Sequence, residues 1–186
     1  MTAEQFHQRI WEILEDLNSD YFQVVAAPAP EPQAVAAAEA LTGVPVPAYY
    51  SAFCQRTNGL CVMAREEFWP EAELYSVGPA WTFWRGVVLL GFDSPDLPEW
   101  ASVTAACERL ADYEVTGVLP LMKVVGDGNI IWGLDKSGTP VEVAEGEITR
   151  LPADFTVCYE EQIRGLAERQ SEMMERIAEQ KRPAAE

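Results

Sequence analysis

Residues 118–143 of this 186-residue chain read VLPLMKVVGDGNIIWGLDKSGTPVEV. Three runs rich in apolar and β-branched residues, 118–125, 129–134 and 139–143, are separated by the turn-forming sequences GDG and DKSG. Short β-rich runs joined by turns of Gly and Asp are typical of neighbouring antiparallel strands. We therefore expect an antiparallel meander in the second half of the chain.

Strand-like sequence also occurs earlier in the chain. Residues 87–92 form a continuous apolar run, which predicts a buried strand. Residues 60–84 contain many apolar side chains without a clean helical or strand period. For that stretch we expect a short strand followed by a long structured loop.

The N-terminal segment has the pattern of a helix followed by a linker. Apolar residues recur at spacings of three and four over residues 2–24, and Thr2 with Gln5 matches a capping box. Alternating prolines in residues 26–32 exclude a helix and favour an extended, polyproline-like spacer. The sequence predicts one helix that is appended to the domain by a semi-rigid strap.

Four more helices are predicted between this linker and the C-terminus. They cover residues 33–41, the segment from Pro47 to the Asn58-Gly59 pair, residues 96–112 and residues 154–181. Gly43 suits a left-handed C-terminal cap for the first of them, and Asp96 and Asp154 are the expected N-caps of the last two. At 1.5 Å per residue the final helix is on the order of 40 Å long. Its distal half would then be solvated, packed on the N-terminal helix, or shared with a second copy.

The charge of the chain restricts its partners. Thirty Asp and Glu against thirteen Lys and Arg give a formal net charge of -17. Such a chain is repelled by nucleic acid and by anionic membranes, so we expect neither as a ligand and expect a basic partner instead. No secretory signal is visible and no apolar stretch is long enough to span a bilayer, so we expect a cytoplasmic protein.

Residues for nucleophilic or metal chemistry are few. The single His7 lies far in sequence from the four cysteines, and no Cys-x-x-Cys spacing occurs. We interpret the cysteines as reduced, mostly buried side chains and expect no metal, no cofactor and no enzymatic activity. These cysteines are Cys54, Cys61, Cys107 and Cys158.

Two acidic regions are candidate surfaces for a basic partner. The expected loop mixes acidic and aromatic side chains; the rings would supply buried area and the acids would steer encounter. The alternative interpretation is that the aromatic rings of this loop fill the core and that its acidic side chains are solvated. The second region begins within the last predicted strand and continues beyond it. The candidate residues are Glu66, Glu67, Trp69, Glu71, Glu73, Trp81 and Trp84 in the loop, and Glu142, Glu145 and Glu147 in the second region.

The order of these signals resembles the SUKH superfamily, which includes bacterial immunity proteins and yeast cell-wall assembly regulators. Residues 38–53, AEALTGVPVPAYYSAF, followed by Thr57-Asn58-Gly59, look like the family's signature of leucine-proline, a tyrosine helix and asparagine-glycine. Val46 departs from it, because leucine is usual before the proline. Further matching pieces are VLPL at 118–121, GDGN at 126–129, LD at 134–135, PV at 140–141 and DF at 154–155.

The resemblance implies an α+β domain with a mixed or antiparallel sheet of about four to six strands flanked by helices. It divides the chain into an N-terminal helix and linker (1–32), a core domain (33–160) and a long C-terminal helix with a short tail (154–186). The extra N-terminal helix and the end of the last helix lie outside the resemblance.

Many bacterial members of the superfamily look like neutralisers of secreted toxins. The resemblance therefore implies an immunity protein that binds a cognate toxin domain, expected to be a basic nuclease, and occludes its active site or substrate access. The alternative is a non-enzymatic scaffold or regulatory protein of the same fold. We also expect that the chain can form a homodimer through its terminal helices.

Overall fold

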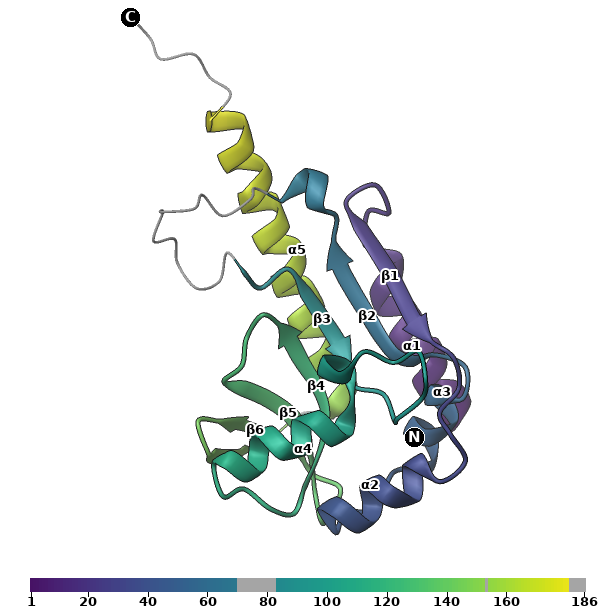
Figure 1. The fold of residues 1–186 in the computed structure, drawn as a ribbon. Helices are drawn as coiled ribbons and strands as arrows, with labels where there is room; N and C mark the ends of the chain where they lie inside the picture. The colour runs from purple at the N-terminus through teal and green to yellow at the C-terminus, as the bar shows by residue number, and fades with distance from the viewer. Residues whose placement is uncertain (70–82, 153, 181–186) are drawn as a thin grey trace, which may run out of the picture.

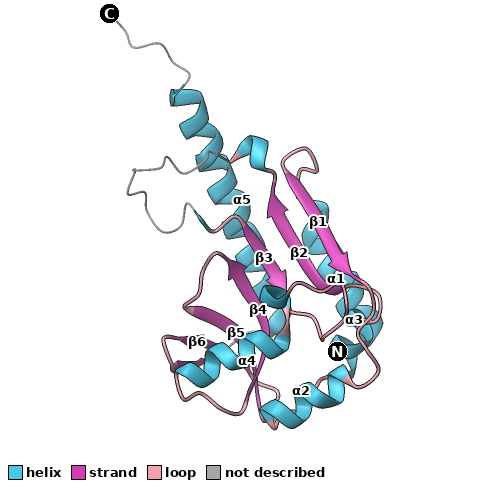
Figure 2. Cartoon of the chain, viewed as in Figure 1, coloured by secondary structure: helices cyan, strands magenta, loops and turns pink. Residues whose placement is uncertain are grey.

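The computed structural model describes residues 1–69, 83–152 and 154–180. Its centre is one sheet of seven strands that follow each other in chain order, and every neighbouring pair is antiparallel. Helices flank the sheet, as Figures 1 and 2 show. The predicted α+β class is confirmed, and the sheet has more strands than expected.

The strands are β1 (Phe22–Ala27), β2 (Asn58–Ala64), β3 (Gly86–Leu89), β4 (Val118–Val125), β5 (Ile130–Asp135), β6 (Pro140–Ala144) and β7 (Glu147–Arg150). The helices are α1 (Ala3–Glu15), α2 (Ala34–Thr42), α3 (Ala48–Cys54), α4 (Val103–Asp112) and α5 (Phe155–Gln180), with short 3-10 turns η1 (Glu66–Phe68) and η3 (Glu99–Ala101). In Figure 1, α1 and α5 cover one face of the sheet and α4 lies across the other.

The N-terminal segment differs from its prediction. Helix α1 ends at Glu15, and β1 occupies residues that were expected to finish the helix and begin the linker. The cause is a turn around Asn18, whose side chain accepts a hydrogen bond from the Asp20 amide (2.9 Å) and whose carbonyl accepts one from the Phe22 amide (3.1 Å). A side chain that bonds the local backbone in this way competes with helix propagation.

Helix α1 is part of the main core rather than an appendage. Its capping box forms as predicted between Thr2 and Gln5. Phe6 and Ile10 are fully buried in the same cluster as the strands. Arg9 also forms an ion pair with Glu160 of α5. The predicted strap (residues 26–32) begins inside a strand, since its first two residues end β1, which pairs with β2.

The start of α4 also differs from its prediction. The N-cap is Ser102, whose hydroxyl accepts from the Ala105 amide (3.0 Å), whereas Asp96 had been expected to cap the helix. Backbone bonds explain the difference: the Gly91 amide donates to the Ala101 carbonyl, and the Val103 amide donates to the Gly91 carbonyl, both at 2.9 Å. These bonds keep the preceding residues out of a helix.

The Asn58-Gly59 pair starts β2 instead of ending α3. Asn58 is completely buried, and its side-chain amide donates to the Phe92 carbonyl (2.7 Å) and accepts from the Phe92 amide (2.9 Å). Gly59 has a φ of 64°, and a Cβ there would lie 2.3 Å from Leu97 Cδ1. The pair thus ties β2 to the chain that follows β3.

Tyr50 joins the helices of one face to the sheet. Its buried hydroxyl lies 2.7 Å from the Leu90 carbonyl oxygen and 3.1 Å from that of Leu121, and its single proton is shared between these two acceptors. The ring contacts Phe6 of α1 and Phe155 of α5, with centroid separations of 5.9 and 6.4 Å. One side chain therefore contacts α1, α5 and the backbone beside β3 and within β4.

We predict that Tyr50→Phe lowers the free energy of unfolding by about 1–3 kcal/mol, because the buried carbonyls lose the shared hydroxyl proton, although the Leu121 carbonyl keeps its bond from the Leu90 amide. Urea denaturation measures the change. The matched control is Tyr49→Phe, since the Tyr49 hydroxyl has no hydrogen-bond partner in the described part of the chain, and we expect less than about 0.5 kcal/mol there. Equal effects of the two variants would contradict this role for the Tyr50 hydroxyl.

The turn between β5 and β6 is organised by the carboxylate of Asp135. It accepts hydrogen bonds from the Ser137 hydroxyl (2.5 Å), the Ser137 amide (2.8 Å), the Thr139 amide (3.1 Å) and Arg150 Nε (3.0 Å). These bonds, with that from the Ser137 hydroxyl foremost, lower the pKa of Asp135 from 3.8 to about 2. The ionised form is the one that the folded turn stabilises.

A pH dependence follows from this shift. Because the pKa of Asp135 is lower in the folded protein than its ordinary value of 3.8, its contribution to stability is complete above that value and disappears as the pH falls towards 2. Asp135→Asn should therefore be less stable than the wild type near neutral pH, and the difference should vanish in this acidic window. Denaturant titrations at stepped pH test it; a difference that does not change with pH would refute the assignment.

Candidate interaction surface

The predicted loop surface is only partly within the described residues. Trp69 is 7% exposed and belongs to the core, and Trp84 is partly buried against it. The Trp84 carbonyl accepts a hydrogen bond from Arg169 Nε of α5 (3.2 Å). For these two rings the structure favours the alternative in which they fill the core.

The acidic residues of the same region lie at the surface. Glu66 and Glu67 are exposed in η1, and Glu66 Oε1 lies 3.1 Å from Arg85 Nη1. Glu71, Glu73 and Trp81 lie outside the described residues. A partner-binding role for this group stays a prediction.

The second predicted region contains a hairpin that sequence reasoning missed. Glu145 and Gly146 both have positive φ, 51° and 88°, and Ala144 pairs with Glu147 across them. Two positive-φ residues between antiparallel strands define a type I′ turn, which matches the twist of the strands. The acid-glycine pair between VEVA and EITR was the available signal for it.

The three predicted glutamates of this region have different surroundings. Glu142 is half-buried, and its Oε2 accepts a hydrogen bond from Trp132 Nε1 (3.0 Å), so it already serves the packing of β5 against β6. Glu145 and Glu147 flank Gly146 at the tip of the hairpin and are exposed. Of the three glutamates, only Glu145 and Glu147 have side chains that form no hydrogen bond or ion pair with the described residues.

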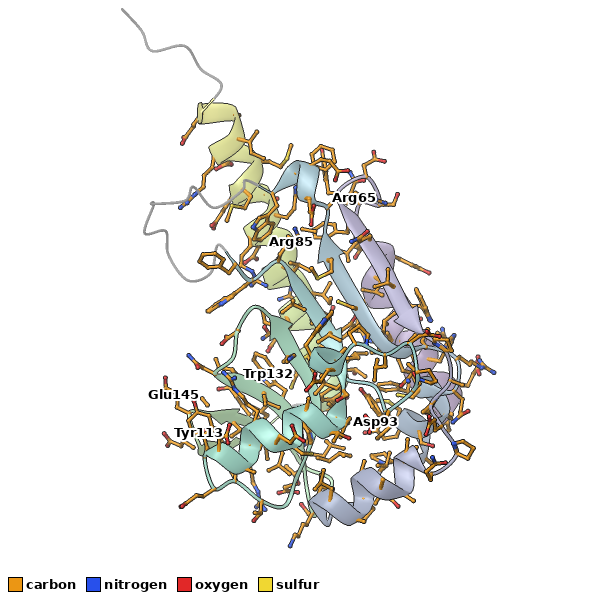
Figure 3. All side chains as sticks on the ribbon, in the orientation of Figure 1. Arg65, Arg85, Asp93, Tyr113, Trp132 and Glu145 are labelled. Atoms are coloured by element: carbon orange, nitrogen blue, oxygen red, sulfur yellow. The ribbon has the colours of Figure 1, made fainter. Side chains whose placement is uncertain are left out.

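The hairpin tip lies directly against the end of α4. A Cβ built on Gly146 would be 3.2 Å from Tyr113 Cβ. Figure 3 shows Tyr113 and Glu145 at the same corner of the molecule. We define the hairpin surface as six exposed residues that flank this contact: Asp112, Tyr113, Glu114, Glu145, Glu147 and Ile148.

The hairpin surface combines apolar and acidic side chains. Tyr113 is 40% exposed and Ile148 is 46% exposed, and the other four members are carboxylates. Exposed aromatic and aliphatic groups with a charged rim are typical of protein-binding surfaces. Sequence reasoning missed Tyr113 and Ile148, because neither exposure nor proximity to Gly146 can be read from the chain.

Two of the carboxylates occupy unusual backbone positions. Glu114 and Glu145, with φ of 58° and 51°, are the non-glycine residues of the described chain that have positive φ. Glu114 follows the last turn of α4, where the Val115 amide donates to the Leu110 carbonyl (3.0 Å) in a Schellman-type ending that usually takes glycine. The left-handed conformation costs roughly 1–2 kcal/mol for a residue with a Cβ. At both of these left-handed positions the residue is a glutamate, and both glutamates belong to the hairpin surface.

The cysteines are free, as predicted, and three of them are buried. Burial raises the pKa of Cys61 to about 12 and that of Cys107 to about 11, and it also raises the pKa of Cys54 and Cys158. Thiols in these surroundings stay protonated near neutral pH and are weak nucleophiles. Across residues 1–69, 83–152 and 154–180, no three acidic, histidine or cysteine side chains are grouped so that they could hold a metal ion.

None of the helices in the described ranges combines the length and apolar character that crossing a bilayer requires. No protein-family model matches the chain, and no curated protein matches its sequence. The resemblance to the SUKH superfamily therefore rests on the quoted residues alone and stays a prediction.

We predict that Trp69→Ala lowers the free energy of unfolding by about 3–5 kcal/mol, because a buried indole is replaced by a cavity. Phe83→Ala is the control: Phe83 is 57% exposed, and we expect a change within about 0.5 kcal/mol. Thermal and denaturant unfolding provide the measurement. A small effect of Trp69→Ala would contradict the burial of this ring and would again make Trp69 a candidate for partner binding.

Proposed function

We propose that this chain is an immunity protein, which binds a basic toxin domain through the hairpin surface and blocks its active site or its access to substrate. One observation carries the proposal: at the contact between α4 and the β6–β7 hairpin, two exposed apolar residues lie next in the chain to exposed acidic residues, and two acidic residues there occupy backbone positions that favour glycine. The proposal includes a cytoplasmic location, where the toxin would otherwise act.

The apolar and acidic side chains of the hairpin surface would contribute to binding in different ways. Tyr113 and Ile148 offer apolar area that a partner can bury, which supplies affinity. The surrounding carboxylates, within a chain of net charge -17, attract a cationic protein and accelerate encounter. A nuclease needs Lys and Arg side chains to hold phosphates, and these are the groups that carboxylates can engage.

The strained glutamates support a role in binding. Glycine at position 114 or 145 would relieve the backbone but would remove a carboxylate from the surface. Residues in sparsely populated backbone conformations concentrate at functional sites, where the surrounding structure holds them.

Co-expression with the candidate toxin domain encoded beside this chain tests the proposal. We expect survival of the host and recovery of a stoichiometric complex whose association slows as ionic strength rises. Host death without complex formation would overturn the immunity function.

The double variant Glu114→Gly, Glu145→Gly locates the interface. We predict that it is more stable than the wild type by about 0.5–1 kcal/mol per site, because the left-handed positions favour glycine. Its association with the toxin domain at low salt should be at least about tenfold slower, because two steering charges are lost.

The matched control for this variant is Glu175→Gln, Glu179→Gln, which removes the same charge from the exposed end of α5. It should associate nearly as fast as the wild type. Charge reversal at Glu66 and Glu67 tests the loop surface in the same assay. Wild-type association for the glycine variant, with slow association for the loop variant, would move the interface to the loop.

A scaffold or regulatory protein is the second candidate, and the shape of α5 favours it. The C-terminal end of this helix projects beyond the sheet in Figure 1. Truncation after Met174 keeps the buried Met173 and removes most of the projecting turns. A homodimer that this truncation dissociates, together with failure to neutralise any toxin, would favour the second candidate.

A further inference from the structure

A groove of about 350 Å³ lies between α4 and the face of the sheet formed by β4 and β5. Lys123 and Ile131, which pair in register across these strands, line it from the sheet. Arg109 lines it from α4, and Trp100 of η3 and the Gly128 turn contribute further parts of the wall. The groove contains two cations although the chain as a whole is strongly acidic.

Lys123 lacks a counter-ion among the described residues. It is half-buried, and no carboxylate of the described residues lies within 4.0 Å of its ammonium group. Burial, followed by the charge of Arg109, lowers the pKa of Lys123. A cation removed from water beside a like charge is stabilised by an anion that binds to it.

Arg109 is held in place by the turn between β4 and β5. Its Nε donates to the Gly128 carbonyl (3.0 Å). A Cβ on Gly128 would lie 2.1 Å from Arg109 Nη2, so the guanidinium packs directly on the glycine backbone. No carboxylate is within ion-pair distance of Arg109 in the described parts of the chain. A fixed guanidinium that lacks a carboxylate partner suits a planar anion such as a carboxylate.

The remaining lining determines what kind of anion fits. Trp100 is 44% exposed, and with Ile131 it offers an apolar surface next to the cations. Glu99 and Asp127 also line the groove, so its formal charges cancel and a multiply charged ligand is disfavoured. The Asp127 carboxylate is already used, because its Oδ1 accepts from the Asn129 amide (2.9 Å).

We propose that this groove binds a small monoanionic carboxylate with an aromatic or branched apolar body. The carboxylate contacts Lys123 and Arg109, and the body packs against Trp100 and Ile131. The groove has the size of a small-molecule site, in which a few polar groups orient a mainly apolar ligand. The site is distinct from the hairpin surface and does not depend on the proposed immunity function.

Titration of the ¹⁵N-labelled full chain tests the site by NMR, with phenylacetate as the probe and its neutral isostere 2-phenylacetamide as the comparison. We expect saturable shifts at the Trp100 indole and the Gly128 amide with phenylacetate. The amide should bind at least about tenfold more weakly, because it lacks the charge that Lys123 and Arg109 engage. Equal binding of the two probes, or no saturable shift with phenylacetate, would overturn the proposal.

Variants locate the binding to the groove. Lys123→Met should weaken phenylacetate binding at least about tenfold, whereas Lys136→Met, at an exposed lysine outside the groove, should leave it unchanged. Gly128→Ala should also weaken it, because the new Cβ displaces Arg109. Unaltered phenylacetate binding by Lys123→Met would overturn the proposal. If that variant fails to fold, the proposal is tested by comparing phenylacetate with 2-phenylacetamide on the wild-type protein.

Discussion

The hydrogen bonds from the Tyr50 hydroxyl to the carbonyls of Leu90 and Leu121 set the position of α3 on the sheet. This hydroxyl is completely buried, so leaving it or its acceptors unpaired would carry a large penalty. Once α3 is fixed, Phe6 of α1 and Phe155 of α5 pack against the same ring. The helices on one face of the sheet therefore pack around the same buried tyrosine.

With that face covered by helices, the opposite face presents the features that concern function. Helix α4 lies across it, and the Ser102 cap and the backbone bonds to Gly91 decide where this helix begins. Its last turn places Arg109 over the turn between β4 and β5, and its C-cap places Tyr113 against the β6–β7 hairpin. One helix thus positions two surfaces of different chemistry, an acidic apolar one and a groove whose two cations form no ion pair with the described residues.

Local patterns in the sequence predict much of this fold. The meander in residues 118–143, the end of α2 at Gly43 (φ 65°) and the cap of α5 at Asp154 all depend on nearby residues, and all three form as expected. The prediction fails where a residue far away in the sequence determines the local structure. β1 is a strand only because β2 pairs with it, and Asn58 bonds to Phe92 rather than ending a helix. Only part of the hairpin surface could be predicted from the sequence: Glu145 and Glu147 were predicted, whereas the exposed apolar residues Tyr113 and Ile148 were not.

Hydrogen–deuterium exchange of the full chain with and without the candidate toxin domain addresses the binding surface most directly. If the hairpin surface is the interface, the amides of residues 112–114 and 145–148 gain protection in the complex, while those of the exposed end of α5 do not. Protection confined to residues outside the hairpin surface, such as those around η1, would contradict the proposal and assign the partner to another face.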